Sequence, residues 1–431
     1  MYQFRNQSLA WFIFIAAIFF SSCSVHRQLE RSAEKAFQST GFLSSANIGI
    51  SVFDPQSKKF LYDLNGEKYF IPASNTKLFT CYAAMKYLGD SLEGIRYYFQ
   101  NDSLFVIPTG DPTLLHPDFQ TQPVLDFLLQ NKQYPIAIAD HIMNDYGWGY
   151  GWSWDDYADY YMPERSAFPV FGNVVRFTKP QDQLTAIPFL ENWKISYSAK
   201  ENSGIKREIS SNVFSVPQSF EGRAEVPFFA DSGRTNRAIL EDSFKLQLSQ
   251  FTYSGHPCKV IYSQPTDSML RKMMYRSDNF FAEQSLLMVS ALFFNRMNDR
   301  MVIDSLLQTD LHLLPQKPQW IDGSGLSRFN LFSPRDFVFL LQKMKEEFEW
   351  KRITAILPTG GTGTLSSYKE FEGKLFAKTG TLSNNIALSG YAITNKNRHL
   401  IFSILVGNHT AREQEIRTAM RKFLNDIITR Y

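Results

Sequence analysis

Two residues one helical turn apart, Ser74 and Lys77, could act together as a nucleophile and a base. They lie in the segment FIPASNTKLFTCYAAMKYLGD at residues 70–90, where apolar residues recur at spacings of three and four. The apolar positions are Leu78, Cys81, Tyr82, Met85 and Leu88. This spacing predicts a helix with one apolar face. Extended by a turn toward the N-terminus, that face includes Lys77 and then Ser74, so the pattern directs a lysine and a hydroxyl toward the interior.

Such a pair suits acyl transfer. A serine hydroxyl is a weak nucleophile until a base removes its proton. An inward lysine can be that base, because burial disfavours the ammonium and lowers its pKa. A serine at a helix N-terminus would also place backbone N–H groups near a developing oxyanion. We therefore predict Ser74 as the nucleophile and Lys77, largely neutral before the reaction, as the general base. The S-x-x-K spacing alone is weak support, since roughly one or two chance matches are expected in a chain of this composition, and a surface lysine is the alternative.

Two further motifs contain residue types that could hold a substrate. Ser277 and Asn279 are two positions apart in RSDNFFAEQ, so their side chains can point together only at a turn or where a helix begins. The alternative there is a plain helix N-cap. The segment FAKTGTL reads as a strand that contains Lys378, Thr379 and Gly380. The glycine would leave room for a ligand backbone to approach, and the alternative is a lysine at a hairpin edge.

The elements that must position these motifs come from both ends of the chain. Alternating apolar runs predict one hairpin at residues 46–66 and another at 387–407, and the K-T-G segment adds a fifth strand. Helical periodicity is strong at 268–276 and 280–294, and S-P-R-D is a capping pattern for a helix from Ser333. The last helix is predicted to open with a capping box from Thr410 to Glu413. This pattern indicates an α/β domain of five strands flanked by helices, with the middle of the chain as an insertion.

Length and composition set the domain organisation. A chain of 431 residues is too long for one ordinary domain, so we predict two or three. The predicted main domain combines residues 25–90 and 258–431, and the inserted region covers 91–257. Short strand-like pieces predict a small β-rich module at 166–230 within it.

Charge and histidine spacing exclude some classes of function. A formal charge of +3, without a basic run interleaved with aromatics, gives no reason to expect nucleic acid as a partner. The 7 histidines are scattered without metal-ligand spacing, so we predict neither a metal nor another cofactor.

The N-terminus has the pattern of an export signal. Arg5 precedes an uncharged apolar run from Leu9 to Phe20, which is too short to span a bilayer but fits a signal sequence. The small residues before Cys23 resemble a bacterial lipobox, although Phe20 departs from the usual leucine. We predict that residues 1–23 are a signal peptide with lipidation at Cys23, and that the protein is an exported lipoprotein of the periplasm or cell envelope. The alternatives are an ordinary cleaved signal and an uncleaved anchor.

Taken together and in this order, S-x-x-K, S-x-N and K-T-G resemble the motifs of penicillin-recognising serine enzymes. The extended segments ASNTKLFT, GDPTL, SDNFFAE, DGSGLS and AKTGTLSNNIALSGY are similar to those of the low-molecular-weight class C penicillin-binding proteins, the D-alanyl-D-alanine carboxypeptidase/endopeptidase family. The resemblance covers about residues 40–430 and is least clear at 165–230. The insertion is short for that family. The resemblance implies a transpeptidase-like domain with a five-stranded antiparallel sheet flanked by helices and smaller inserted β-rich domains.

The resemblance also implies roles for the motif residues. Ser74 attacks the carbonyl between two D-alanines, Lys77 acts as general base, and Ser277 relays a proton to the leaving amine. The substrate-binding residues it implies are Asn279 for an amide, Lys378 and Thr379 for the terminal carboxylate, Gly380 beside them, and Thr381, whose N–H joins that of Ser74 in an oxyanion hole. The implied partners are peptidoglycan stem peptides and β-lactam antibiotics, together with the membrane through the N-terminal anchor. The oligomeric state stays open.

A cluster of aromatic and acidic residues could bind the free amine of a stem peptide. Trp154, Asp156 and Tyr161 combine aromatic faces with a carboxylate, which suits an ammonium group. A packed aromatic cluster is the alternative.

We therefore predict a penicillin-sensitive serine-type D-alanyl-D-alanine carboxypeptidase/endopeptidase, with two alternatives. A serine β-lactamase would need a base for the hydrolytic water, for which no convincing glutamate motif is present. The separation of 203 positions from Ser74 to Ser277 (277 − 74) also requires an insertion that compact β-lactamases lack. The second alternative is a non-catalytic peptidoglycan-binding or penicillin-sensing lipoprotein.

Overall fold

The computed structural model describes residues 26–38, 45–143, 145–179, 183–199 and 204–431. The predicted signal peptide and Cys23 lie outside these residues. Within them, no helix is both long and apolar enough to cross a membrane. The described chain forms two compact units. The first contains the chain up to Asn75 with Leu314–Gln319 and Leu331–Tyr431, and the second contains Thr76–Leu313 and Trp320–Asn330.

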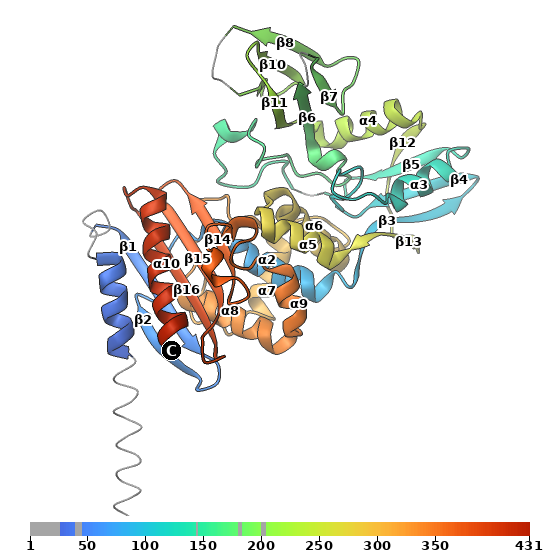
Figure 1. Ribbon diagram of the computed structural model, residues 1–431. Coiled ribbons are helices and arrows are strands. Elements are labelled where there is room, and N and C mark those ends of the chain that lie inside the picture. The colour runs from blue at the N-terminus through green and yellow to red at the C-terminus, as the bar shows by residue number, and fades with distance from the viewer. Residues whose placement is uncertain (1–25, 39–44, 144, 180–182, 200–203) are drawn as a thin grey trace, which may run out of the picture. The chain divides into compact units, whose positions relative to one another are not determined.

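The first unit is built on a five-stranded sheet in which all neighbours are antiparallel, in the order β14-β15-β16-β1-β2. Its strands are β1 (Asn47–Asp54), β2 (Lys59–Leu64), β14 (Leu375–Leu382), β15 (Asn385–Ile393) and β16 (His399–Gly407). Figure 1 shows the blue N-terminal strands beside the orange and red C-terminal ones. In the register, Ile50 lies opposite Ile404 and Lys378 opposite Ser389. The predicted sheet, made from both ends of the chain, is confirmed.

Helices cover both faces of this sheet. Successive strand residues point to opposite faces, and on β15 the two faces have different partners. Ile386 and Leu388 share a core with Phe423 of α10 (Glu413–Arg430), whereas the hydroxyl of Tyr391 donates to the backbone oxygen of Leu341 in α8 (Pro334–Glu347) at 2.7 Å. The helices of this unit are η1 (Glu34–Gln38), η2 (Ala73–Thr76, at the boundary between the units), α8 (Pro334–Glu347), α9 (Trp350–Ile356), η6 (Gly363–Leu365), η7 (Lys369–Phe371) and α10 (Glu413–Arg430).

The two predicted helix caps in this unit have different outcomes. Ser333 caps α8 through a capping box with Asp336, as its sequence predicts. The prediction that Thr410 caps the last helix is wrong, because the cap position is Arg412. The Arg412 amide donates to the Glu415 carboxylate at 3.2 Å, so the reciprocal contact forms two residues further along the chain.

The second unit begins with a buried helix. α2 (Lys77–Tyr87) packs against α5 (Thr266–Arg276) and α6 (Asn279–Phe294), and α7 (Asp299–Gln308) packs on α6. Every residue from Lys77 to Met85 is buried. The apolar stripe of α2 therefore marks residues that are buried, as predicted, but the opposite side of the helix is covered as well.

The rest of the second unit is rich in strands. A mixed five-stranded sheet has the order β12-β5-β4-β3-β13. Its strands are β3 (Ser91–Gln100), β4 (Ser103–Pro108), β5 (Ile136–Asp140), β12 (Leu248–Thr252) and β13 (Lys259–Pro265), with the helices α3 (Pro123–Gln130) and α4 (Arg234–Phe244). Two three-stranded sheets lie in the predicted β-rich region, and the strands of the second fall in the sequence between β7 and β11 of the first. They contain β6 (Val174–Lys179), β7 (Thr185–Ile187) and β11 (Gly222–Pro227), and β8 (Lys194–Ser198), β9 (Lys206–Arg207) and β10 (Val213–Pro217).

The unit boundaries differ from the predicted domain boundaries. Helices α5, α6 and α7 group with the region 91–257 instead of with the five-stranded antiparallel sheet. The division into a main domain of 25–90 and 258–431 with an insertion at 91–257 stays a prediction.

Candidate active site

In the first unit, the sheet fixes the backbone around Ser74. Ser74 is half-buried in η2, and the preceding residue, Ala73, has a φ of +49°, a left-handed conformation that side chains with a Cβ adopt infrequently. The side-chain amide of Asn75 donates to Ser389 Oγ at 2.7 Å, and that hydroxyl donates to Ser403 Oγ at 2.8 Å. The residue after Ser74 is thus tied to the two central strands β15 and β16.

The K-T-G strand lies against the same backbone. A Cβ on Gly380 would lie 2.5 Å from the backbone oxygen of Pro72 and 3.1 Å from the backbone nitrogen of Ser74, so only glycine fits there. The room that Gly380 was expected to leave for a ligand backbone is filled at this point by the chain's own backbone. The structure therefore brings Ser74 and Gly380 together.

The other residues of this motif differ in exposure. Lys378 and Thr379 are buried, and the Lys378 ammonium donates to the backbone oxygen of Thr379 at 2.7 Å. Thr381 is exposed, and its hydroxyl oxygen accepts from Arg417 Nη2 of α10 at 2.7 Å. The motif thus presents a buried cation and two threonines along one strand.

In the second unit, Lys77 is fully buried at the start of α2, directly after η2. Its ammonium donates to Asn279 Oδ1 at 2.6 Å and to the backbone oxygen of Ser324 at 2.7 Å. Burial lowers the pKa of Lys77 to about 8, against the opposing charges of Asp322, Glu283 and Asp278. With this pKa, roughly a tenth of the lysine is neutral at pH 7. The direction of the shift agrees with the expected base, although the neutral fraction is smaller than we expected.

The S-x-N motif occupies the turn between α5 and α6. Ser277 ends α5 with a φ of +61°, and Asn279 is the first residue of α6. Asp278 between them is the N-cap, with its carboxylate accepting from the Phe281 N–H at 3.0 Å. The motif is therefore both a helix cap and a turn, and its Asn279 contacts Lys77.

The three residues of the predicted amine pocket lie in or near η3 (Trp154–Asp156). The Trp154 side chain is 74% exposed, so it does not belong to a packed aromatic cluster. Burial raises the pKa of Asp156, and a hydrogen bond from Tyr161 opposes this shift. The backbone oxygen of Tyr161 accepts from Asn279 Nδ2 at 2.8 Å. Of the three residues, Tyr161 thus directly contacts a residue of the S-x-N motif.

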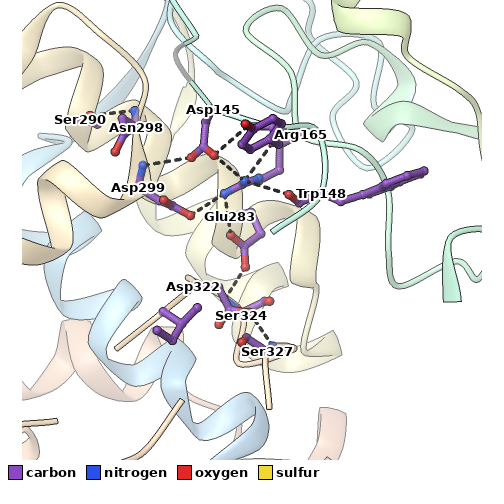
Figure 2. A network of polar contacts seen from close by, with 12 residues as sticks. Asp145, Trp148, Arg165, Glu283, Ser290, Asn298, Asp299, Asp322, Ser324 and Ser327 are labelled. Carbon is purple, nitrogen blue, oxygen red and sulfur yellow. Dashed lines mark hydrogen bonds and ion pairs between the residues drawn. The ribbon is translucent and has the colours of Figure 1, made fainter. Parts of the chain in front are cut away.

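The structure adds polar residues near Lys77 that the motifs did not identify. Glu283 is buried on α6, and its carboxylate accepts from the Ser324 N–H at 2.7 Å. Asp322 and Arg165 belong to the same network (Figure 2). A charged residue within an apolar helical run, four positions after Asn279, was a signal that could have identified Glu283.

Known proteins resemble this chain over almost its whole length. Residues 29–427 match the D-Ala-D-Ala carboxypeptidase 3 (S13) family. D-alanyl-D-alanine carboxypeptidase DacB of Haemophilus influenzae is 21% identical, with 86% of this chain and 88% of that protein covered. The D-alanyl-D-alanine carboxypeptidase of Actinomadura sp. strain R39 is 24% identical, with 85% and 79% covered.

A solved structure supports the fold. Penicillin binding protein 4 (dacB) from Haemophilus influenzae aligns with a TM-score of 0.72 at 19% identity, covering 92% of this chain and 98% of that chain. The same protein has been solved in a complex with a β-lactam. The likeness confirms the predicted penicillin-recognising fold with additional β domains.

The family match covers far more than half of the sequence. It confirms the predicted resemblance and the predicted serine-type D-alanyl-D-alanine carboxypeptidase, a hydrolase. The chain belongs to the D-Ala-D-Ala carboxypeptidase 3 (S13) family.

Proposed function

We propose that Ser74 attacks the carbonyl carbon between the two terminal D-alanines of a peptidoglycan stem peptide and forms an acyl-enzyme. One observation carries this assignment: the lysine three residues after Ser74 is fully buried, and burial lowers its pKa to about 8. The neutral fraction of Lys77 takes the proton of the Ser74 hydroxyl as the new C–O bond forms. An ordinary surface lysine is almost entirely protonated at neutral pH and could not act in this way.

The remaining motif residues complete the reaction. Ser277 relays a proton to the amine of the leaving D-alanine, which departs as the C–N bond breaks. Asn279 binds a substrate amide, and Lys378 and Thr379 bind the terminal carboxylate, for which a buried cation beside a hydroxyl is suited. Water then cleaves the ester, returns the hydroxyl to Ser74 and releases the shortened peptide.

The oxyanion that forms during both steps needs hydrogen-bond donors. We assign this role to the backbone N–H groups of Ser74 and Thr381. The close approach of Gly380 to the Ser74 backbone supports this pairing, because it places the strand end that carries Thr381 beside Ser74. Loss of one such donor typically lowers the rate by ~10²–10³-fold.

The proposed substrates and inhibitors share one feature, a carboxylate next to a cleavable amide. β-Lactams have it, and the β-lactam complex of penicillin binding protein 4 supports penicillin sensitivity as a proposal for this chain. The free amine of the stem peptide would be bound by Trp154, Asp156 and Tyr161. We propose release of the terminal D-alanine as the main activity and cleavage of peptide cross-links as a second one.

The intact mass of the protein after incubation with benzylpenicillin tests this function. The chain from residue 24 should gain one persistent adduct, the Ser74→Ala variant should gain none, and the wild type should release D-alanine from a D-alanyl-D-alanine peptide. Rapid turnover of the drug without an adduct would indicate a β-lactamase. Neither adduct nor turnover, together with binding to peptidoglycan by both proteins, would indicate a non-catalytic binding protein.

We also propose that the protein is exported to the cell envelope and anchored there by a lipid on Cys23. The support is the sequence alone, an apolar run followed by FSSC. Incorporation of labelled palmitate into the full chain in a bacterial host should be lost in the Cys23→Ala variant. Unchanged labelling of that variant, or no labelling of the wild type, would contradict lipidation at this residue.

A further inference from the structure

The contacts of Lys77 lead to a carboxyl group outside the three motifs. The backbone oxygen of Ser324 accepts from the Lys77 ammonium at 2.7 Å, and the N–H of the same residue donates to Glu283 Oε1 at 2.7 Å. One buried residue thus connects the lysine to the carboxyl. Glu283 lies on α6 one turn beyond Asn279, which contacts Lys77 directly.

The loop that carries Ser324 is held between two helices. Thr80 of α2 donates its hydroxyl to the backbone oxygen of Gly323 at 2.7 Å. A Cβ on Gly323 would lie 2.7 Å from the backbone oxygen of Ala282, so the loop lies directly against α6. Asp322 in this loop accepts hydrogen bonds from Trp152 Nε1, the N–H groups of Gly325 and Ser327, and Asn330 Nδ2. The carbonyl that Lys77 contacts is therefore fixed on several sides.

Glu283 is itself held in place by a buried guanidinium (Figure 2). Arg165 Nη1 lies 3.6 Å from Glu283 Oε2 and 2.5 Å from Asp299 Oδ2, and Arg165 Nη2 lies 3.0 Å from Asp145 Oδ1. The side chains of Arg165 and Glu283 are each only 1% exposed. Ser324 thus donates a hydrogen bond to one oxygen of the carboxyl, and the Arg165 guanidinium lies 3.6 Å from the other without a hydrogen bond.

We propose that Glu283 is a positioning residue for Lys77: with Arg165 behind it, Glu283 fixes the Ser324 carbonyl that orients the lysine amine for proton transfer. This inference rests on the proposed role of Lys77 as the general base. A lysine has a long flexible stem, and its amine acts only where fixed acceptors hold it. A displacement of about 1 Å in a reacting group can lower a rate ~10²-fold.

Charged groups on neighbouring elements shift the pKa values of Lys77 and Glu283. Asp322 and Asp278 face Lys77 together with Glu283, and the charge of each raises the pKa of the lysine. Burial raises the pKa of Glu283 to about 8, with Asp322 and Asp299 adding to the shift and Arg165 opposing it. Glutamine at position 283 would keep an oxygen acceptor for the Ser324 N–H and remove the negative charge that Glu283 gains as the pH rises through its pKa of about 8. The pKa of Lys77 should therefore fall in that variant.

The test is the rate constant of benzylpenicillin acylation, measured by intact mass between pH 6 and 10 for Glu283→Ala and Glu283→Gln. Alanine should slow acylation ~10–100-fold, because the Ser324 N–H loses its acceptor and the carbonyl loses one of the contacts that fix it. Glutamine should restore the rate to within about threefold, because it keeps the acceptor. It should also move the rising limb of the pH profile to lower pH. A matched control is Ser285→Ala, which removes a buried hydroxyl from the same helix. That hydroxyl donates to the backbone oxygen of Phe281, so the acylation rate and its pH profile should stay unchanged.

Each outcome decides the matter. A folded Glu283→Ala protein that acylates at the wild-type rate would overturn the inference. If that variant does not fold, Glu283→Gln decides by its rate and its pH profile. A maximal rate within about threefold of the wild type, with the rising limb at lower pH, supports the inference. A maximal rate reduced more than about tenfold, or a rising limb at the wild-type pH or above, overturns it. Failure of the proposed function is recognised separately, because the wild type would then form no adduct.

Discussion

Lys77 and Arg165 are two buried cations in the same unit, and they show how the groups around a cation determine whether its pKa falls or rises. Lys77 is fully buried, and the Arg165 side chain is 1% exposed. Removal from water disfavours the charged form of both. Their pKa values nevertheless move in opposite directions.

The difference lies in the oxygens that surround each cation. Lys77 donates to an amide oxygen and a backbone carbonyl, which are neutral, and burial lowers its pKa to about 8. For Arg165, burial acts in the same direction, but the charges of Asp299, Glu283 and Asp145 outweigh it and raise the pKa. Neutral acceptors hold a cation in place and still allow it to lose its proton, whereas carboxylates keep it charged. The first arrangement suits a base and the second a structural ion pair.

The largest expected effect on the acylation rate comes from replacing Lys77 with arginine. Lys77→Arg keeps a positive charge, but a guanidinium does not lose its proton near neutral pH. Acylation by benzylpenicillin should fall by ~10²–10⁴-fold, the usual contribution of a general base. Lys77→Met is the control for charge, and it should fall as far. An arginine variant that acylates within tenfold of the wild type would show that Lys77 is not the base.

The next effect comes from removing the other cation. Arg165→Met leaves three carboxyl groups without their compensating charge, which should lower the free energy of unfolding by ~3–5 kcal/mol. Urea unfolding at pH 7 measures this loss. Arg234→Met is a matched control, since that side chain is 68% exposed and pairs with Asp231 at the surface. It should lose less than about 1 kcal/mol. Equal losses of unfolding free energy in the two variants would show that the buried Arg165 cluster stabilises the fold no more than a surface ion pair does.

A third change would make the surroundings of Lys77 resemble those of Arg165. In the wild type the acylation rate should rise with pH through about 8, because the neutral amine is the active form. Asn279→Asp places a carboxylate on the lysine and should move this limb upward by ~1–3 pH units, as an opposite charge at contact distance does. The pH–rate profile of acylation tests both statements. A wild-type profile with no ionisation below pH 9 would contradict the lowered pKa.

The smallest effect concerns the ammonium group of the substrate. Trp154 is 74% exposed, so Trp154→Ala should leave thermal stability unchanged. If the indole face binds the stem-peptide amine, the loss of about 0.5–1 kcal/mol should raise KM by about two- to fivefold. An acetylated stem peptide serves as the control and should show no change. Equal changes in KM for both peptides would show that Trp154 does not bind the stem-peptide amine.

Much of the fold followed from local patterns. The alternating runs at β1, β2, β15 and β16 and the period of α5 and α6 each carry their own signal, because one face of each element must leave water. The Ser333 cap was predictable for the same reason, since its partner Asp336 is close in sequence. At the last helix two overlapping patterns compete, and the sequence alone did not select Arg412 over Thr410.

The sequence by itself determined the family and the motifs S-x-x-K, S-x-N and K-T-G, because acyl transfer requires particular residue types at fixed spacings. It also directed Lys77 inward. Only the tertiary structure decided what this lysine meets there: Asn279 and Ser324 reach it from positions more than 200 residues away. Glu283 is marked by its charge in an apolar helical run, but its contacts with Ser324 and Arg165 have no local signature. The pKa of a buried group depends on the oxygens packed around it, and packing brings those together from distant parts of the chain.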